Sequence, residues 1–165
     1  MLFIILSALH TAFIVAYILK NQMGKTQPEW YNFQEQICEY FKSLGFDATS
    51  NVTVDGARTN HAIDVLVKTK FMGQELIWII EAKKWNSKVK KLQVLGLRMI
   101  ASDVGVDRGF IISELGFQKG AIEAAIKSNI TLTTFKELKI ITQAFIEEDI
   151  LKQHEERIAL IYRRY

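Results

Sequence analysis

The segment LIWIIEAKKWNSKVKKLQ, residues 76–93, decides the fold of this chain. Its first part is an apolar run typical of a buried β-strand, and the run ends in Glu81, Ala82 and Lys83. Because side chains alternate between the two faces of a strand, Glu81 and Lys83 are predicted to point to the same side. The segment therefore predicts a strand that presents a carboxylate and an ammonium group together at its end.

An upstream apolar run contains a second carboxylate, Asp64. If the strand over residues 62–71 pairs with the next strand through the turn near residues 72–73, Asp64 and Glu81 converge beside Lys83. Two carboxylates form an oxygen site suited to Mg²⁺, and a neighbouring lysine can hold or deprotonate a water and stabilise charge on a phosphate. The arrangement predicts phosphodiester hydrolysis. The structural alternative is an ion pair between Lys83 and one carboxylate in an inactive domain.

Length and composition set wide limits on the class of protein. The chain has 165 residues, 49% of them apolar, which is enough for one domain with a sizeable core and short for two. A net charge of +3 permits nucleic acid binding without demonstrating it. Cys38 is the only cysteine, so an internal disulfide and a thiolate zinc site within the chain are excluded.

The amino terminus differs from the rest of the chain, because residues 1–19 contain no Asp, Glu, Lys or Arg. As a helix this stretch would reach about 28 Å, close to the hydrocarbon thickness of a bilayer. We therefore predict three segments: a transmembrane anchor over residues 1–21, a polar linker over 22–28, and one domain over 29–165.

Positive residues after the predicted anchor indicate its orientation. Lys20 and Lys25 follow the apolar stretch, which by the positive-inside rule places the domain in the cytoplasm as part of a single-pass membrane protein. The alternatives are a buried core helix, or a translation start near Met23 that leaves the stretch untranslated.

Hydrophobic periodicity predicts four helices and five strands after the linker. The helices are expected over residues 30–44, 87–101, 116–128 and from 136 onwards, and the strands over residues 46–54, 62–71, 75–82, 108–113 and 130–135. In the second of these helices Val89, Leu92, Leu95 (or Gly96) and Met99 are predicted to form the apolar side. This order predicts an α/β fold with a mixed sheet flanked by helices on both faces.

Several short motifs follow one another in a characteristic order. They are Tyr31-Asn32-Phe33-Gln34-Glu35 ahead of Leu44-Gly45-Phe46, then Ile63-Asp64-Val65, Glu81-Ala82-Lys83-Lys84-Trp85, Lys88-Val89 before Gln93, Gly109-Phe110-Ile111-Ile112, and Asn129-Ile130-Thr131-Leu132 before Lys136-Glu137-Leu138. In this series the chain resembles the Mrr-type restriction endonucleases of the PD-(D/E)XK nuclease superfamily, over about residues 30–138. One departure is the loop at residues 58–62, where relatives usually have a glycine-rich loop.

The resemblance implies a restriction-endonuclease-like fold and a specific set of site residues. Asp64 and Glu81 would bind the metal, with the Ala82 carbonyl as a third ligand and Glu35 as an additional acidic residue near the metal. Lys83 would position and activate the attacking water, and Gln93 resembles the active-site glutamine of the family. At Gln34, many relatives begin a pair of glutamates.

The implied activity is Mg²⁺-dependent cleavage of DNA that leaves a 5′-phosphate, with Mn²⁺ as a substitute ion. The residues predicted to contact DNA are Lys84, Lys88, Lys90, Lys91, Arg98 and His61. The chain could also assemble as a homodimer. The alternative functions are an inactive nucleic-acid-binding or scaffold module at the membrane, and a nuclease for repair or recombination intermediates.

Overall fold

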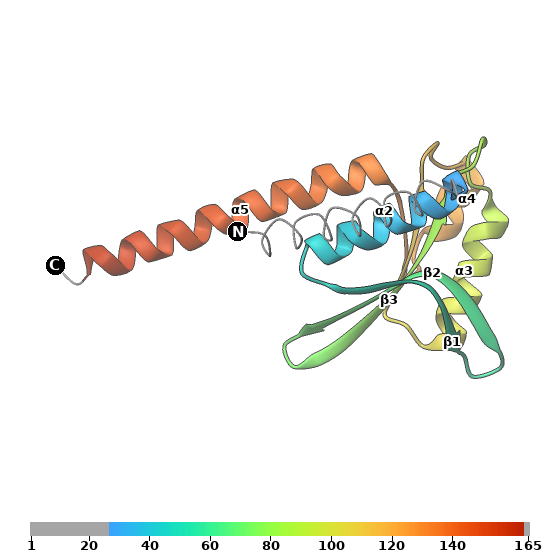
Figure 1. Ribbon diagram of the computed structural model, residues 1–165, viewed down its shortest axis with the longest axis horizontal. Helices are drawn as coiled ribbons and strands as arrows, with labels where there is room; N and C mark the ends of the chain where they lie inside the picture. Colours follow the sequence, from blue (N-terminus) through green and yellow to red (C-terminus); the bar gives the residue numbers. More distant parts are fainter. Residues whose placement is uncertain (1–26, 164–165) are drawn as a thin grey trace, which may run out of the picture.

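The computed structural model describes residues 27–163, which fold around one five-stranded sheet (Figure 1). The strands are β1 (Asp47–Asp55), β2 (Asn60–Phe71), β3 (Gln74–Lys83), β4 (Arg108–Ser113) and β5 (Ile130–Thr134). They lie side by side in chain order, with β1, β2 and β3 antiparallel and β3, β4 and β5 parallel. The mixed sheet predicted from the sequence is therefore confirmed.

The hairpin between β2 and β3 forms where the sequence predicts it. Met72 and Gly73 both adopt positive φ angles, 50° and 80°, as a two-residue type I′ turn requires. The turn sets the register of the pair, from Phe71 opposite Gln74 to Val65 opposite Ile80. Asp64 and Glu81 consequently arrive next to one another just beyond the last pair.

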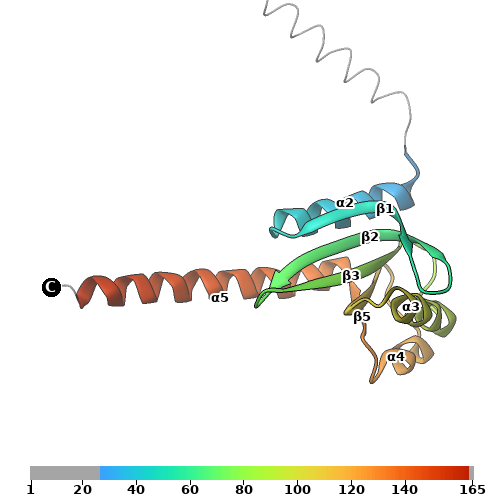
Figure 2. The ribbon, with the colours of Figure 1, turned by 90° about the horizontal axis from the view of Figure 1, so that it is seen from below.

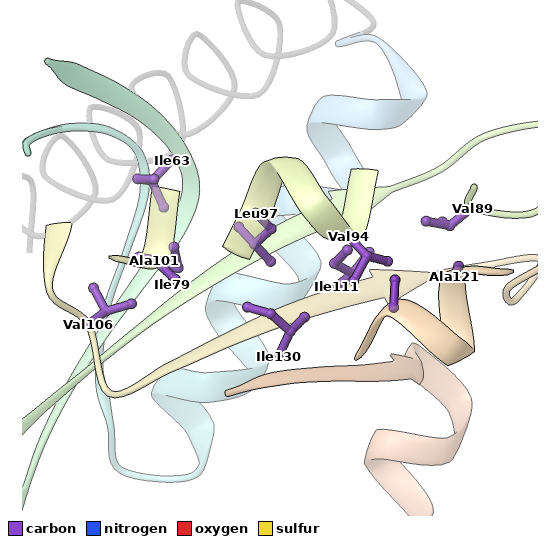
Figure 3. Close-up of a cluster of buried hydrophobic side chains, with 11 residues drawn as sticks. Ile63, Ile79, Val89, Val94, Leu97, Ala101, Val106, Ile111, Ala121 and Ile130 are labelled. Atoms are coloured by element: carbon purple, nitrogen blue, oxygen red, sulfur yellow. The ribbon is translucent and has the colours of Figure 1, made fainter. Parts of the chain in front are cut away.

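Helices cover both faces of the sheet (Figure 2). α2 (Glu29–Ser43) packs on one face through residues such as Phe33, Ile37 and Phe41. α3 (Lys91–Val104) and α4 (Lys119–Ala125) cover the other face, where Val94, Leu97 and Ala121 meet the sheet (Figure 3). The sheet therefore has a separate hydrophobic core on each side.

α3 begins later than the periodicity predicts, and it buries a different stripe. Val89 is fully buried before the helix, in an isolated bridge to Phe117, so the residues ahead of Lys91 are not helical. Leu92 and Met99, predicted on the apolar side of this helix, are 73% and 65% exposed. The buried stripe is Val94, Leu97 and Ala101. The sequence carries apolar residues on two sides of this helix, and packing against the sheet buries the side with Val94, Leu97 and Ala101.

The last helix, α5 (Phe135–Tyr162), starts at the end of β5 and runs out beyond the sheet (Figures 1 and 2). Thr134 caps it, because its hydroxyl accepts from the Glu137 N–H at 3.1 Å and Glu137 accepts from the Thr134 N–H at 2.8 Å. Phe135 packs edge-on against Phe33 and Tyr40 of α2, with ring centroids 5.8 and 5.5 Å apart. These contacts fix the first turn of α5 against the body.

None of the helices within residues 27–163 is both long and apolar enough to cross a bilayer. The predicted anchor at residues 1–21, and the linker up to residue 26, lie outside the described residues.

Candidate active site

The two strands that carry the predicted metal ligands separate at the site. β2 and β3 are paired only as far as Val65 and Ile80, although β3 stays paired with β4 as far as Lys83 opposite Ser113. Beyond this point the Ala82 N–H donates to Asp64 Oδ2 at 2.8 Å. A carboxylate thus replaces the backbone acceptor that the neighbouring strand would supply, which opens the sheet at Asp64 and Glu81.

The strand alternation also breaks at Asp64. Ile63 and Val65 are two residues apart and should share a face, yet Ile63 belongs to the core under α3 and Val65 to the core under α2. Asn51, in the neighbouring strand β1, has a positive φ of 52°. The local twist places the Asp64 carboxylate toward the backbone of Ala82 instead of fully into either core.

Glu81 and Lys83 lie on the same side of β3, as predicted, and their side chains form an ion pair. The two side chains are 25% and 15% exposed, so the pair is partly shielded and still open to solvent. The Lys83 ammonium also lies over the Trp85 ring, 4.8 Å from its centroid. Two contacts therefore hold the lysine beside the carboxylates.

The electrostatics of Asp64 are those of a carboxylate held away from water beside a second negative charge. Burial raises the pKa of Asp64 above its ordinary value, and the charge of Glu81 raises it further. The Ala82 N–H, Lys83 and a hydrogen bond from Gln34 act in the opposite direction. Because the upward effects dominate, the charged form of Asp64 is disfavoured, and a bound cation would offset that cost.

The donor set fits a divalent cation that prefers oxygen. Asp64 and Glu81 supply two carboxylates, and the Ala82 carbonyl points to the same side of β3 as the N–H that reaches Asp64, because both groups of a strand residue face one neighbour. Within residues 27–163 there is no cluster of three or more His, Cys, Asp or Glu side chains that could hold a metal. The site therefore has two carboxylates and depends on neutral oxygens for the rest.

The structure brings Gln34, and not Glu35, to Asp64. Gln34 is 6% exposed and its side chain hydrogen bonds to the Asp64 carboxylate. Glu35 instead accepts a hydrogen bond from the Asn51 amide at 3.4 Å. The resemblance points to Glu35 as the additional acidic residue near the metal, whereas the face of α2 that packs on the sheet carries Gln34. The available signal was the position of Gln34, next to Phe33 on the buried stripe of α2.

Gln93 lies in the first turn of α3 and caps the amino-terminal end of that helix. Its Oε1 accepts from the Lys90 N–H at 3.1 Å, and its own N–H donates to the Lys90 carbonyl at 3.2 Å. This contact is structural, so the proposed catalytic role of Gln93 stays a prediction.

The residues predicted to contact DNA are divided between two settings. Lys88, Lys90 and Lys91 are exposed around the start of α3. Lys84 pairs with Glu114 at 3.6 Å, and Arg98 donates to the Ala124 carbonyl at 3.2 Å. Among the hydrogen bonds and ion pairs of residues 27–163, none involves the ammonium groups of these three exposed lysines.

His61 has a structural partner. Its Nε2 is 2.7 Å from Asp103 Oδ2, and the Arg58 Nε donates to Asp103 Oδ1 at 2.6 Å. These bonds lower the pKa of Asp103 to about 2. The loop between β1 and β2, which replaces the expected glycine-rich loop, is therefore tied to the end of α3. His61 Nε2 already has a protein partner in Asp103, and the contact of His61 with DNA stays a prediction.

Comparison with solved structures places the fold. A protein of unknown function, AF1548, matches with a TM-score of 0.56 and 21% identity over 65% of this chain and 59% of its own. The MspJI restriction endonuclease in complex with a 27-mer oligonucleotide matches with a TM-score of 0.42 and 14% identity, over 73% of this chain and 28% of its own. The DNA modification-dependent restriction endonuclease AspBHI matches with a TM-score of 0.38 and 16% identity, over 68% and 34%. This chain therefore spans less than two thirds of each of these proteins.

Comparison of the sequence gives the family. No curated protein matches it. A family model described as a restriction endonuclease, Mrr_cat, matches residues 26–141, which include every residue of the predicted site. Because that match covers well over half of the 165 residues, the chain belongs to the Mrr_cat restriction endonuclease family and contains a nuclease domain of the restriction type.

Proposed function

We propose that the protein is a DNA endonuclease that depends on a divalent cation, with Mg²⁺ as the expected ion and Mn²⁺ as a substitute. The observation that carries the proposal is the convergence of Asp64, Glu81 and Lys83 where β2 and β3 separate. Membership of the restriction endonuclease family supports the choice of DNA as the substrate.

Asp64, Glu81 and the Ala82 carbonyl would hold the cation. When bound, the cation supplies Lewis acidity, which makes a water more acidic and neutralises charge on the phosphate. Asp64 is pre-positioned for this role by the Ala82 N–H and by Gln34. Glu81, which pairs with Lys83 in the structure, would contact the cation instead, and the Lys83 ammonium would then be free to turn toward substrate.

Lys83 would orient the attacking water by hydrogen bonding and stabilise the charge that develops on the phosphate. The water gives up a proton to solvent as its oxygen forms a bond to phosphorus on the side opposite the leaving 3′-oxygen, and the P–O3′ bond breaks. The products are a 5′-phosphate and a 3′-hydroxyl, whose proton comes from solvent. The exposed lysines Lys88, Lys90 and Lys91 would neutralise neighbouring phosphates.

Cleavage of supercoiled plasmid by the purified full-length chain tests the proposal. We expect cutting with Mg²⁺ or Mn²⁺ and none with EDTA, and loss of most activity in Asp64→Asn and Glu81→Gln. An inactive native protein that still binds DNA would favour the alternative of a silent binding module. Cleavage of branched DNA, with plasmid left uncut, would favour repair or recombination.

The anchor over residues 1–21, the linker over 22–28 and the domain over 29–165 are part of the proposal, as are the cytoplasmic location of the domain and the homodimer. Full-length protein should remain with membranes through a carbonate wash. Recovery of the native protein in the supernatant would remove the anchor from the proposal and leave the nuclease site unaffected. The mass of the full-length protein in detergent, measured by light scattering, shows whether it is a monomer or the proposed homodimer.

A further inference from the structure

Gln34 leaves a buried acceptor without a donor. Its Oε1 is the single buried side-chain nitrogen or oxygen that lacks a hydrogen-bond partner among residues 27–163. Buried polar atoms in folded proteins are nearly always paired, so an exception indicates a strained group or a ligand that binds there. Gln34 as a whole is only 6% exposed, so its side chain is packed inside the protein.

The position of this atom is fixed by its neighbours. Phe33 and Ile37 are both buried in the core under α2, which holds the helix against the sheet at Gln34. The side chain of Gln34 hydrogen bonds to the Asp64 carboxylate, and because its Oε1 is unpaired, the donor in that bond is Nε2. Oε1 and Nε2 share one carbon atom, so Oε1 lies beside the same carboxylate.

We propose that Gln34 is a positioning residue of the metal site, whose Nε2 orients Asp64 and whose Oε1 accepts a hydrogen bond from a water in the hydration shell of the cation. This inference rests on the proposed function. A hydrated divalent cation fits the orphaned acceptor, because Mg²⁺ and Mn²⁺ retain water ligands that donate hydrogen bonds outward. Groups in this role commonly change metal affinity about 10- to 100-fold when they are removed.

The neutral amide also sets the charge of the site. With glutamine at position 34 the site has the two carboxylates of Asp64 and Glu81, and the described residues contain no group of three or more His, Cys, Asp or Glu side chains that could hold a metal. Since cation affinity increases with the number of carboxylates, Gln34→Glu should bind the ion more tightly than the native protein. Gln34→Leu should bind it more weakly, because it has neither donor nor acceptor.

The proposal can be tested without turnover by measuring the binding of Mn²⁺ to the full-length chain. Electron paramagnetic resonance detects this binding as a loss of the free-ion signal. We expect Gln34→Leu to raise the Kd for Mn²⁺ by about 10- to 100-fold and Gln34→Glu to lower it. Gln36→Glu, the matched control, adds the same charge two residues along α2 on an exposed position and should leave the Kd within about twofold of native.

The outcomes separate this inference from the proposed function. If Asp64→Asn abolishes binding while Gln34→Leu and Gln34→Glu bind as the native protein does, Gln34 has no role toward the ion and only the further inference is overturned. If native protein does not bind Mn²⁺ at millimolar concentration, both fall. Thermal unfolding in EDTA checks that each variant folds, and if Gln34→Leu does not, an unchanged Kd in Gln34→Glu overturns the inference alone.

Discussion

Asp64→Asn should stabilise the metal-free protein while it removes stabilisation by metal. Burial, followed by the charge of Glu81, raises the pKa of Asp64 in the folded state above its value in the unfolded chain. The folded protein therefore binds this proton more tightly, and its stability decreases as the pH rises through the raised pKa. At neutral pH the carboxylate opposes folding, and asparagine removes that charge with little change in volume.

The structure sets the balance of the competing effects. Asparagine keeps an oxygen that can accept from the Ala82 N–H, now 2.8 Å from Asp64 Oδ2, so the loss is the charge assistance of that bond, about 1 kcal/mol. The variant also loses the attraction of Lys83 and changes the hydrogen bond with Gln34, but it no longer buries a charge beside that of Glu81, which the raised pKa of Asp64 shows to be the larger effect. We expect Asp64→Asn to gain about 1 kcal/mol in EDTA, a rise in Tm of about 2–4 °C for a domain of this size.

Metal should reverse the order of the two proteins. At a Mg²⁺ or Mn²⁺ concentration about 100 times the Kd, binding stabilises the native protein by about 2.7 kcal/mol, which the variant lacks. Differential scanning fluorimetry of both proteins, in EDTA and with each metal, measures the two shifts. The prediction is wrong if the variant melts well below native in EDTA, or if metal raises both Tm values equally.

Further predictions test the loop, the basic surface and the Asp103 cluster. In urea unfolding, Gly56→Ala should lower the free energy of unfolding by about 1–3 kcal/mol, because a Cβ there would overlap the Asp103 carboxylate and lie 2.7 Å from the Thr59 carbonyl oxygen. Gly96→Ala in α3, where a Cβ meets nothing within 4 Å, should raise the free energy of unfolding by about 0.5–1 kcal/mol in the same assay. Replacing Lys88, Lys90 and Lys91 with glutamine should reduce the slope of log affinity for DNA against log salt by about 0.9 for each phosphate that is no longer neutralised, and an unchanged slope would place the DNA elsewhere. The pKa of Asp103, held at about 2, lies below the pKa of aspartate in the unfolded chain, so the stabilisation by this carboxylate is present above the unfolded pKa and is lost as the pH falls toward 2. Asp103→Asn should flatten that part of a curve of stability against pH. Identical curves for the variant and the native protein would contradict the role given to Arg58 and His61.

Local sequence pattern was sufficient for most of the secondary structure. The strand predicted over residues 108–113 matches β4 (Arg108–Ser113), because a short, wholly apolar run between polar loops has few alternatives to a buried strand. The turn at Met72 and Gly73 then placed Asp64 next to Glu81, since hairpin register follows from turn length. The pairing of Glu81 with Lys83 followed from strand alternation.

Contacts between distant residues were beyond the reach of local pattern. The periodicity places Val89 first in a helical stripe, whereas in the structure Val89 forms a bridge to Phe117 and α3 begins at Lys91. The hydrogen bond between His61 and Asp103 has no local signal, because Asp103 lies in another element. The resemblance points to an acidic residue near the metal and therefore to Glu35, whereas packing of α2 against the sheet brings Gln34 to Asp64.

The most direct test of the metal-dependent nuclease site is a comparison of plasmid cleavage by native protein, Lys83→Ala and Lys70→Ala in Mg²⁺. Lys83 pairs with Glu81 at the site, whereas Lys70 is an exposed lysine at the far end of the same hairpin, and its replacement removes an equal charge. We predict that native protein and Lys70→Ala cleave at similar rates, while Lys83→Ala loses at least about 100-fold, the contribution expected of one positioned catalytic group. Cleavage by Lys83→Ala at the native rate would contradict the proposed site.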